Sequence, residues 1–399
     1  MKPVSIYPLA GIDNASGRDD ALQVRGKAPH NFLRDAVNVD ISDTGRASMR
    51  PGLRKVSGAA LANLWQSTLH RDTFATLGDQ WVKVDARTWD SQPLATVGDG
   101  PVSHLALNGA VLVAGPAGIF QYDGTAAQRF TLDVPPAPMV SVILGAGSLE
   151  LGTYGAAVSW LRGSTESPRS PVNLGTITTL GAGLSVILPW CMDDTVTHVR
   201  LYLTRQNGGE PLRVEDYPIS TASVELPLLP KLGAPAQFQY KEPMPTGEYL
   251  SYWRGRLLTA RANVLRFSEA LAYHVHDPRH GFVQMPQRIT FVHPTDGGIW
   301  VGQVDHVAFL AGSALGELTL HRKTAKAPVP GSAIALDAED AGDAAGGGGA
   351  VVAWLAENGF ALGAPDGSVV EKHDGRLHAI AGSRGSSAVL AGRLTTAII

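Results

Sequence analysis

Residues 288–312 read RITFVHPTDGGIWVGQVDHVAFLAG and contain three apolar runs of strand length. Within each run the apolar residues alternate, which is the period of a β-strand with one buried face. These residues are Ile289, Phe291, Ile299, Val301, Val307 and Phe309. We expect Pro294 to Gly298 to turn the chain between the first two runs, because proline fixes φ and glycine permits positive φ. The stretch therefore predicts an antiparallel meander of three or four strands, which cannot bury its apolar face alone.

Similar units recur along the chain. Residues 64–130 hold two blocks in which strands alternate with glycine-containing turns, and Asn108-Gly109 is a strong hairpin signal within them. Residues 252–268 and 351–371 follow the same pattern. This repetition predicts a β-propeller, in which short sheets stand around an axis. Residues 387–394 are predicted to pair with an early strand and close the ring, because closure hides reactive sheet edges.

The composition agrees with this fold class. The chain has 399 residues, more than one compact core supports, so we expect at least two domains. Hydrophobic residues make up 44% and charged residues 17% of the sequence, which indicates an ordered globular protein. The 45 glycines and 26 prolines are typical of many short strands joined by turns, and amphipathic helical patterns are scarce. These observations together predict an all-β protein.

Charge and sorting signals exclude some functional classes. A formal net charge of −3 gives no overall basic footprint for nucleic acid, although a local acidic or basic face stays open. The single cysteine, Cys191, excludes an intramolecular disulfide. The first residues, MKPVSIYPLAG, lack the apolar core of a signal peptide, and no apolar run is long enough for a transmembrane helix. We therefore expect synthesis in the cytoplasm and no membrane anchor.

Two proline-rich segments mark predicted domain boundaries at residues 134–138 and 242–245, because proline cannot lie in a central strand. The apolar runs between them are longer, and about seven strands over roughly 100 residues are typical of a β-sandwich. We therefore predict that residues 1–133 form the first part of a β-propeller and residues 246–399 the remainder. Residues 134–245 are predicted to form an inserted immunoglobulin-like or fibronectin type III-like β-sandwich.

Two sets of residues resemble known families. Asn38-Val39-Asp40-Ile41, a turn and then Arg50-Pro51-Gly52 resemble the N-terminal signature of bacteriophage tail proteins, notably the tail-tubular nozzle or hub proteins of short-tailed phages. Met49 stands where that family has a second basic residue. Residues 154–160, Glu166-Ser167-Pro168 and residues 199–202 resemble a fibronectin type III domain, which carries no specific function with it.

The phage-tail resemblance implies a structural virion protein, made in the host cytoplasm, that is not an enzyme and uses no cofactor. Such proteins form a ring of identical subunits, commonly six, around the DNA channel. A tail adaptor or connector lies above the ring, and fibres or spikes lie alongside it. Genomic DNA passes through without specific binding, which an acidic channel lining would favour by repelling phosphates.

Other functions stay open at this point. A baseplate or tail-tip component of a long-tailed phage is the alternative within the same class of structural virion proteins. A carbohydrate-binding or glycan-cleaving propeller would need a funnel lined by tryptophans and carboxylates, and the sequence offers no carboxylate pair placed for glycosidic cleavage. A bacterial surface adhesin is disfavoured by the missing signal peptide.

One segment, residues 274–280 (HVHDPRH), has side chains of the kinds that bind metals. Pro278 and Gly281 predict a loop here, and no separate carboxylate–histidine cluster accompanies it. We therefore predict a surface loop or subunit contact and no metal site. The candidate interface residues are His274, His276, Asp277, Arg279 and His280.

The remaining motifs predict architecture and no chemistry. The sequence has no Gly-x-Ser-x-Gly, His-Glu-x-x-His or paired Cys-x-x-Cys motif, and we assign no catalytic or cofactor-binding residue. Trp253, Trp300 and Trp354 lie on predicted strands, where core packing is favoured over stacking on carbohydrate. Residues 337–349 are poor in apolar side chains and are predicted to form a flexible excursion.

Overall fold

The computed structural model describes residues 7–42, 44–50, 52, 54–69, 71–323, 325–341, 349–373, 375–390 and 392–399. Nearly all regular structure within these ranges is β-strand, which confirms the all-β prediction. The helices are α1 (Ala338–Ala341) and the 3₁₀ turns η1 (Asp19–Leu22) and η2 (Leu315–Glu317). None of the described helices is long and apolar enough to cross a membrane.

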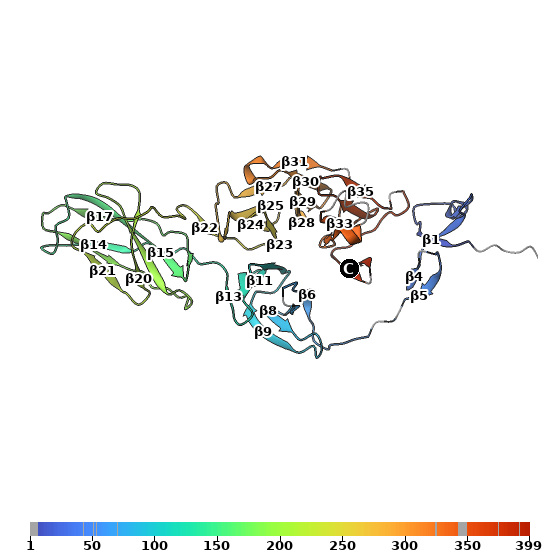
Figure 1. Ribbon diagram of the computed structural model, residues 1–399, viewed down its shortest axis with the longest axis horizontal. Coiled ribbons are helices and arrows are strands. Elements are labelled where there is room, and N and C mark those ends of the chain that lie inside the picture. Colours follow the sequence, from blue (N-terminus) through green and yellow to red (C-terminus); the bar gives the residue numbers. More distant parts are fainter. Residues whose placement is uncertain are drawn as a thin grey trace, which may run out of the picture.

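Figure 1 shows three parts in a row. An N-terminal unit lies at one end, a two-sheet module at the other, and between them stands a set of five sheets that we call the array. The array comprises β6 to β13 and β22 to β35, so its sheets come from both sides of the module in the sequence.

The array sheets are antiparallel and mostly meanders of four strands. The first contains β6 (Ala62–Gln66), β7 (Thr73–Leu77), β8 (Gln80–Val84) and β9 (Ser91–Thr96), and the second β10 (Ser103–Leu107), β11 (Ala110–Gly115), β12 (Gly118–Tyr122) and β13 (Ala127–Arg129). The third contains β22 (Glu242–Pro243), β23 (Glu248–Trp253), β24 (Arg256–Arg261), β25 (Val264–Glu269), β26 (Ala272–His276) and β27 (Phe282–Gln284). The fourth contains β28 (Ile289–Thr295), β29 (Gly298–Gln303), β30 (Val307–Ala311) and β31 (Thr319–Arg322), and the fifth β32 (Ile334–Leu336), β33 (Val351–Ala356), β34 (Gly359–Gly363) and β35 (Val369–Glu371).

Neighbouring sheets stack face to face. Strand β23 lies against β10 on one side and β28 on the other. Apolar cores fill the space between consecutive sheets, and each core takes side chains from both. The pairs include Phe74 with Val113, Leu112 with Leu257, Phe267 with Val301, and Trp300 with Trp354. This radial order of short sheets is the arrangement of a β-propeller-like fold.

The stretch from Arg288 to Gly312 forms β28, β29 and β30 as the meander that its sequence predicts. Both faces of this sheet are buried, so the expectation of a single buried face is wrong. Ile299 faces the third sheet and Trp300 the fifth, because neighbours cover the meander on both sides. The turn is also shorter than predicted, since Pro294 pairs with Ile299 inside the strands and only Asp296-Gly297 link them.

The two-sheet module has one shared core. One sheet contains β14 (Met139–Ile143), β18 (Gly183–Ile187) and β21 (Ser223–Leu226). The other contains β15 (Gly152–Arg162), β16 (Thr165–Glu166), β17 (Asn173–Ile177), β19 (His198–Leu203) and β20 (Leu212–Pro218). Val158, Trp160 and Leu201 from the second sheet pack against Leu184 and Val186 from the first.

The two chain ends form small sheets. The N-terminal unit contains β1 (Leu9–Ile12), β2 (Gln23–Val24), β3 (His30–Leu33) and the hairpin of β4 (Val39–Ile41) and β5 (Ala47–Met49). The C-terminal hairpin contains β36 (Gly385–Leu390) and β37 (Arg393–Ile398), and it packs Val389 and Leu394 on the fifth sheet.

The prediction that residues 387–394 pair with an early strand is wrong, since the chain turns after Leu390 and β36 pairs with β37. A hydrogen bond of 2.9 Å from Arg384 Nη2 to Asn63 Oδ1 links this end of the chain to the first sheet. In the predicted excursion at residues 337–349, Ala338 to Ala341 form helix α1. Residues 342–348 lie outside the described part of the chain.

The packing between the fourth and fifth sheets gives a first prediction. A Cβ at Gly302 would lie 2.2 Å from Cδ1 of Phe291, a buried ring in this core. We expect Gly302→Ala to lower the free energy of unfolding by about 1–3 kcal/mol, because the ring has no room to move. Urea unfolding followed by tryptophan fluorescence measures it. Gly316→Ala is the matched control, since no atom lies within 4 Å of its Cβ position, and equal effects would contradict the argument.

A histidine lies in the aromatic core between the first two sheets. The His104 ring stacks on Trp65 with ring centroids 5.2 Å apart, and Trp81 Nε1 donates a hydrogen bond of 3.1 Å to His104 Nε2. Burial lowers the pKa of His104 to about 3. The ring therefore stays neutral in the folded protein at pH values where an unfolded histidine takes up a proton.

This depressed pKa predicts acid sensitivity. Below pH ~6.5 the unfolded chain binds a proton at His104 that the folded chain does not, so stability is lost as pH falls toward about 3. We expect a loss of up to about 1.4 kcal/mol per pH unit from this group. The free energy of unfolding, measured at several pH values between about 3 and 6.5, should fall less steeply with decreasing pH in His104→Gln. Glutamine keeps an acceptor for the Trp81 indole N–H. The exposed His198→Gln is the control, and an unchanged pH slope in His104→Gln would contradict the prediction.

Candidate functional site

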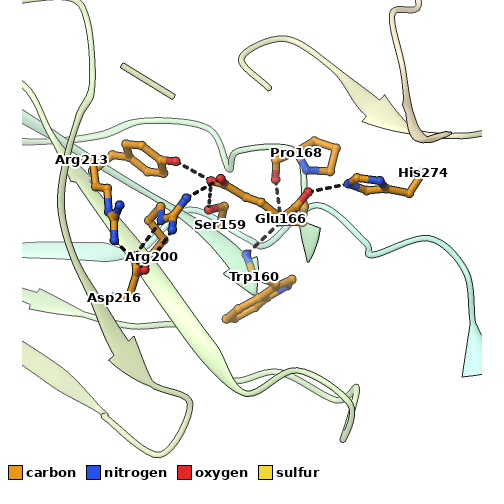
Figure 2. A network of polar contacts seen from close by, with 10 residues as sticks. Ser159, Trp160, Glu166, Pro168, Arg200, Arg213, Asp216 and His274 are labelled. Atoms are coloured by element: carbon orange, nitrogen blue, oxygen red, sulfur yellow. Dashed lines mark hydrogen bonds and ion pairs between the residues drawn. The ribbon is translucent and has the colours of Figure 1, made fainter. Parts of the chain in front are cut away.

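The candidate site is the polar joint between the two-sheet module and the array, where a connected network of hydrogen bonds and ion pairs lies. Its centre is β16 of the module, which faces β26 of the array (Figure 2). The Nε2 atom of His274 lies 2.8 Å from the carbonyl oxygen of Glu166, and the imidazole meets the ring of Phe238 edge to face. Burial lowers the pKa of His274, although its contact with this carbonyl opposes the shift. His274 therefore serves as a neutral hydrogen-bond donor to the module.

The side chain of Glu166 is buried and fully engaged. Its Oε1 atom accepts hydrogen bonds from Ser159 Oγ, at 2.6 Å, and from the hydroxyl of Tyr202. Its Oε2 atom accepts one from Arg200 Nη1 at 2.6 Å. Ser159 and Arg200 are register partners on the neighbouring strands β15 and β19, so the sheet itself positions both donors. Burial, reinforced by the Glu166 carboxylate, raises the pKa of Tyr202, which keeps its hydroxyl a donor.

The network continues onto β20. Arg200 is the register partner of Asp216 and holds it with two bonds, from Nε at 2.7 Å and from Nη2 at 2.9 Å. Arg213 Nη2 adds a third bond to Asp216 Oδ2 at 2.8 Å. The hydrogen bond from Arg200 lowers the pKa of Asp216. Every oxygen of the two carboxylates thus accepts a hydrogen bond, so the network holds the sheet in shape and leaves little room for acid–base chemistry.

Two further contacts cross the joint. Arg162, at the end of β15, donates to the carbonyl oxygens of Arg129 (2.7 Å) and Phe130 (2.9 Å) at the end of the second array sheet. Lys241, on the segment that returns from the module, donates to Glu269 Oε1 and Asp277 Oδ2, each at 2.7 Å. With the His274–Glu166 contact, these make three tethers. They fix the entry, the middle and the exit of the module relative to the array.

The structure separates the five candidate residues of the 274–280 segment. His274 and His276 lie in strand β26, so the loop prediction is wrong for them, because β26 pairs with both β22 and β25. His274 points to the module, whereas His276 is buried with Nδ1 2.9 Å from the carbonyl of Phe267. Asp277, Arg279 and His280 do follow the strand as a loop.

Asp277 is the centre of the loop part. It accepts hydrogen bonds from the backbone N–H of Arg279 at 2.9 Å and from Lys241, and His280 Nδ1 lies 3.5 Å away. Although burial alone would raise its pKa, Lys241 and the Arg279 amide hold the pKa of Asp277 well below its usual range. The Arg279 guanidinium lies over the ring of Tyr240, 5.5 Å from the centroid. Within the described ranges, no three His, Cys, Asp or Glu side chains are placed to hold a metal ion.

Sequence reasoning missed the residues that do most at this joint. Arg162 and Lys241 belong to no motif, and Glu166 was singled out only in the resemblance to a fibronectin type III domain, which assigns it no role. The available signal was position, since Lys241 comes directly before the second proline-rich boundary and Glu166 begins the Glu-Ser-Pro sequence.

A groove of about 690 Å³ opens beside the joint, between the second array sheet and the module. Phe120, Ala127 and Leu132 line it on one side and residues 190–196 on the other. Trp190 and Met192 are 78% and 87% exposed there, whereas burial raises the pKa of the Cys191 thiol between them. The thiol is therefore a poor nucleophile, and Trp190 and Met192 leave two apolar side chains exposed on this rim.

No protein-family model matches the sequence, and no curated protein matches it. Among solved structures, BamB from Moraxella catarrhalis shares 10% sequence identity at a TM-score of 0.36, covering 98% of this chain and 92% of that chain. Hsv2p of Kluyveromyces lactis shares 9% identity at a TM-score of 0.27, covering 79% of this chain and 76% of that one. Scores this low assign neither fold nor function to this chain.

The exit tether gives a prediction about the joint. Lys241→Met leaves the carboxylates of Asp277 and Glu269 without their shared cation in a site where Asp277 is only 10% exposed. We expect a loss of about 1–3 kcal/mol in unfolding free energy and faster proteolysis between residues 230 and 245. Denaturant unfolding and limited chymotrypsin digestion measure the two effects, because trypsin would lose a cleavage site at each replaced lysine. Lys231→Met, at an exposed position, should change neither, and equal behaviour of both variants would contradict the role of Lys241.

Proposed function

We propose that this chain is a structural protein of a bacteriophage tail, a subunit of the ring through which DNA leaves the particle. The observation that carries the proposal is the signature of residues 38–52 together with its place in the fold. Its first part forms strand β4 and the residues before the final Arg-Pro-Gly form β5, joined by the ion pair of Arg50 with Asp40 at 3.0 Å. The hairpin lies beside β1 in the N-terminal unit (Figure 1).

The character of the described sites supports assembly over chemistry. The charged side chains at the joint, among them Glu166, Arg200 and Lys241, form ion pairs with one another or with nearby charges, which supports a role in holding the parts together. Trp253, Trp300 and Trp354 are buried in the cores, as predicted, and cannot stack on a sugar from these positions. A glycan-binding propeller would have to use other aromatic residues.

The finer architecture belongs to the same proposal. The array would be a β-propeller, and the module a fibronectin type III-like insertion that projects from it. Copies of the chain, commonly six in such proteins, would surround the DNA channel, with an acidic lining that repels phosphate. An adaptor or connector protein would bind on one side, and fibres or spikes would attach alongside. The joint would then fix the direction in which each module projects.

Particles of the phage that encodes this chain provide the test. We expect mass spectrometry of purified virions to detect the chain in a fixed small number of copies, and amber mutants in its gene to yield filled heads without a complete tail. Absence of the chain from purified particles would refute the proposal. Cryo-electron microscopy of the virion would place the density at a short tail or, if the baseplate alternative holds, at the tip of a long one.

A further inference from the structure

The C-terminal hairpin occupies the position of a sixth sheet but has half the strands of a complete one. It stacks Val389 and Leu394 on the fifth sheet, as each array sheet stacks on the one before it. Gly385 N donates to the carbonyl of Pro330 and Ser387 Oγ to that of Ser332, which places β36 beside the start of the fifth sheet. Strand β36 thus contacts the chain just before β32, and β37 pairs with β36 on one side. Among the described residues, β37 has no neighbour on its other side.

The free edge of β37 has the features of a strand that could pair with a further strand. Its side chains alternate between half-buried and exposed from Arg393 to Ala397, as in a strand within a sheet. The array's complete meanders carry third and fourth strands at this position. An unpaired strand edge presents backbone donors and acceptors that readily pair with another strand, so a partner of two further strands would satisfy it.

The N-terminal unit has the opposite deficit. Across the described residues from 7 to 50, Phe32 is the one apolar side chain that is buried, and Met49 and Val37 are 82% and 80% exposed. Strands β4 and β5 pair with each other alone. An isolated two-stranded hairpin is marginally stable in water, so this one needs a sheet to join. The β4–β5 hairpin thus has the two strands that the β36–β37 hairpin lacks for a four-stranded sheet.

We propose that the β4–β5 hairpin of one copy pairs with the free edge of β37 in a second copy and completes its sixth sheet. Within one chain the hairpin is held elsewhere. Leu9 N donates to the carbonyl of Gly45 in its turn, and the same unit is held to the segment between β35 and β36 through Asn14, whose Nδ2 donates to His378 O at 3.1 Å. The Arg376 guanidinium also lies over the ring of Phe32, 4.5 Å from its centroid.

The segment that joins the β4–β5 hairpin to the first array sheet of its own copy is long enough for the hairpin to reach a second copy. The residues from Met49 to Ala62 can span at most about 45 Å when extended. Residues 54–61 lie outside any strand or helix, and Val56 is 51% exposed. A hairpin on such an arm can join the edge strand of a neighbour, as in strand addition between proteins. Because donor and acceptor are different surfaces, repetition of the contact generates a ring or a filament.

Cross-linking tests the pairing directly. In a Cys191→Ser background, chains with Ser48→Cys are mixed with chains of a different mass that carry Thr395→Cys, both exposed positions. We expect a disulfide or short bis-maleimide to join the two kinds of chain. Replacing Thr395→Cys by Ser220→Cys, exposed on the module, should abolish the product. A doubly substituted chain that cross-links only within itself would overturn the proposal.

Self-association provides the second readout. By sedimentation velocity we expect Met49→Asp and Ala397→Asp to weaken association of the full chain about tenfold or more. Leu180→Asp, at a module residue that is 78% exposed, should leave association unchanged. Monomers at every concentration, or equal effects of all three variants, would overturn the pairing. The inference rests on the self-assembly in the proposed function. Oligomers in which the Ser48→Cys and Thr395→Cys chains do not cross-link would refute the strand pairing alone. The virion experiment tests the proposed function independently of this pairing.

Discussion

A short sheet with two apolar faces cannot stand alone, and this constraint organises the molecule. In the fourth sheet Ile299 and Trp300 are adjacent residues that point to opposite sides, and both are fully buried. Each face becomes buried only when another sheet stacks on it, so each sheet requires the next one. At roughly 25 cal/mol per Å² of apolar surface removed from water, these contacts between sheets are the main stabilising term. The backbone hydrogen bonds within each meander fix register but do not hold neighbouring sheets together.

The same constraint explains why the joint with the module is polar. The module has its own core, in which Trp160 and Leu201 contact Leu184, so it does not need the array for burial. The contacts at this boundary therefore serve to set the orientation of the module relative to the array. Hydrogen bonds can do this because they are directional. Arg162, Glu166 and Lys241 each contact a different array segment. Three separated contacts remove the rotations that one contact would allow.

The sequence predicted the parts of the fold that depend on local chemistry. Asn108-Gly109 forms the predicted hairpin, with φ of 51° and 76°, because these two residues tolerate that backbone. Pro294 misled the turn prediction, since an edge strand needs no donor at every position and accepts proline there. Pro278 and Gly281 predict a loop for the whole histidine segment, but they begin to act only after His276, where β26 ends. The joint could not be predicted, because Glu166 and His274 are 108 residues apart and only the folded chain brings them together.

The stacking constraint also has a consequence at the ends of the array. A series of stacked sheets must either close or finish on a surface that something else covers. Here the last member is the β36–β37 hairpin, whose outward side chains, among them Ala388, Leu390 and Ala397, are exposed. The N-terminal unit meanwhile lacks a core of its own. If copies exchange these elements, the last sheet of each copy becomes complete only in the assembly. Each module would then project at the angle that its tethers set, so the geometry of one chain would define the geometry of the whole particle component.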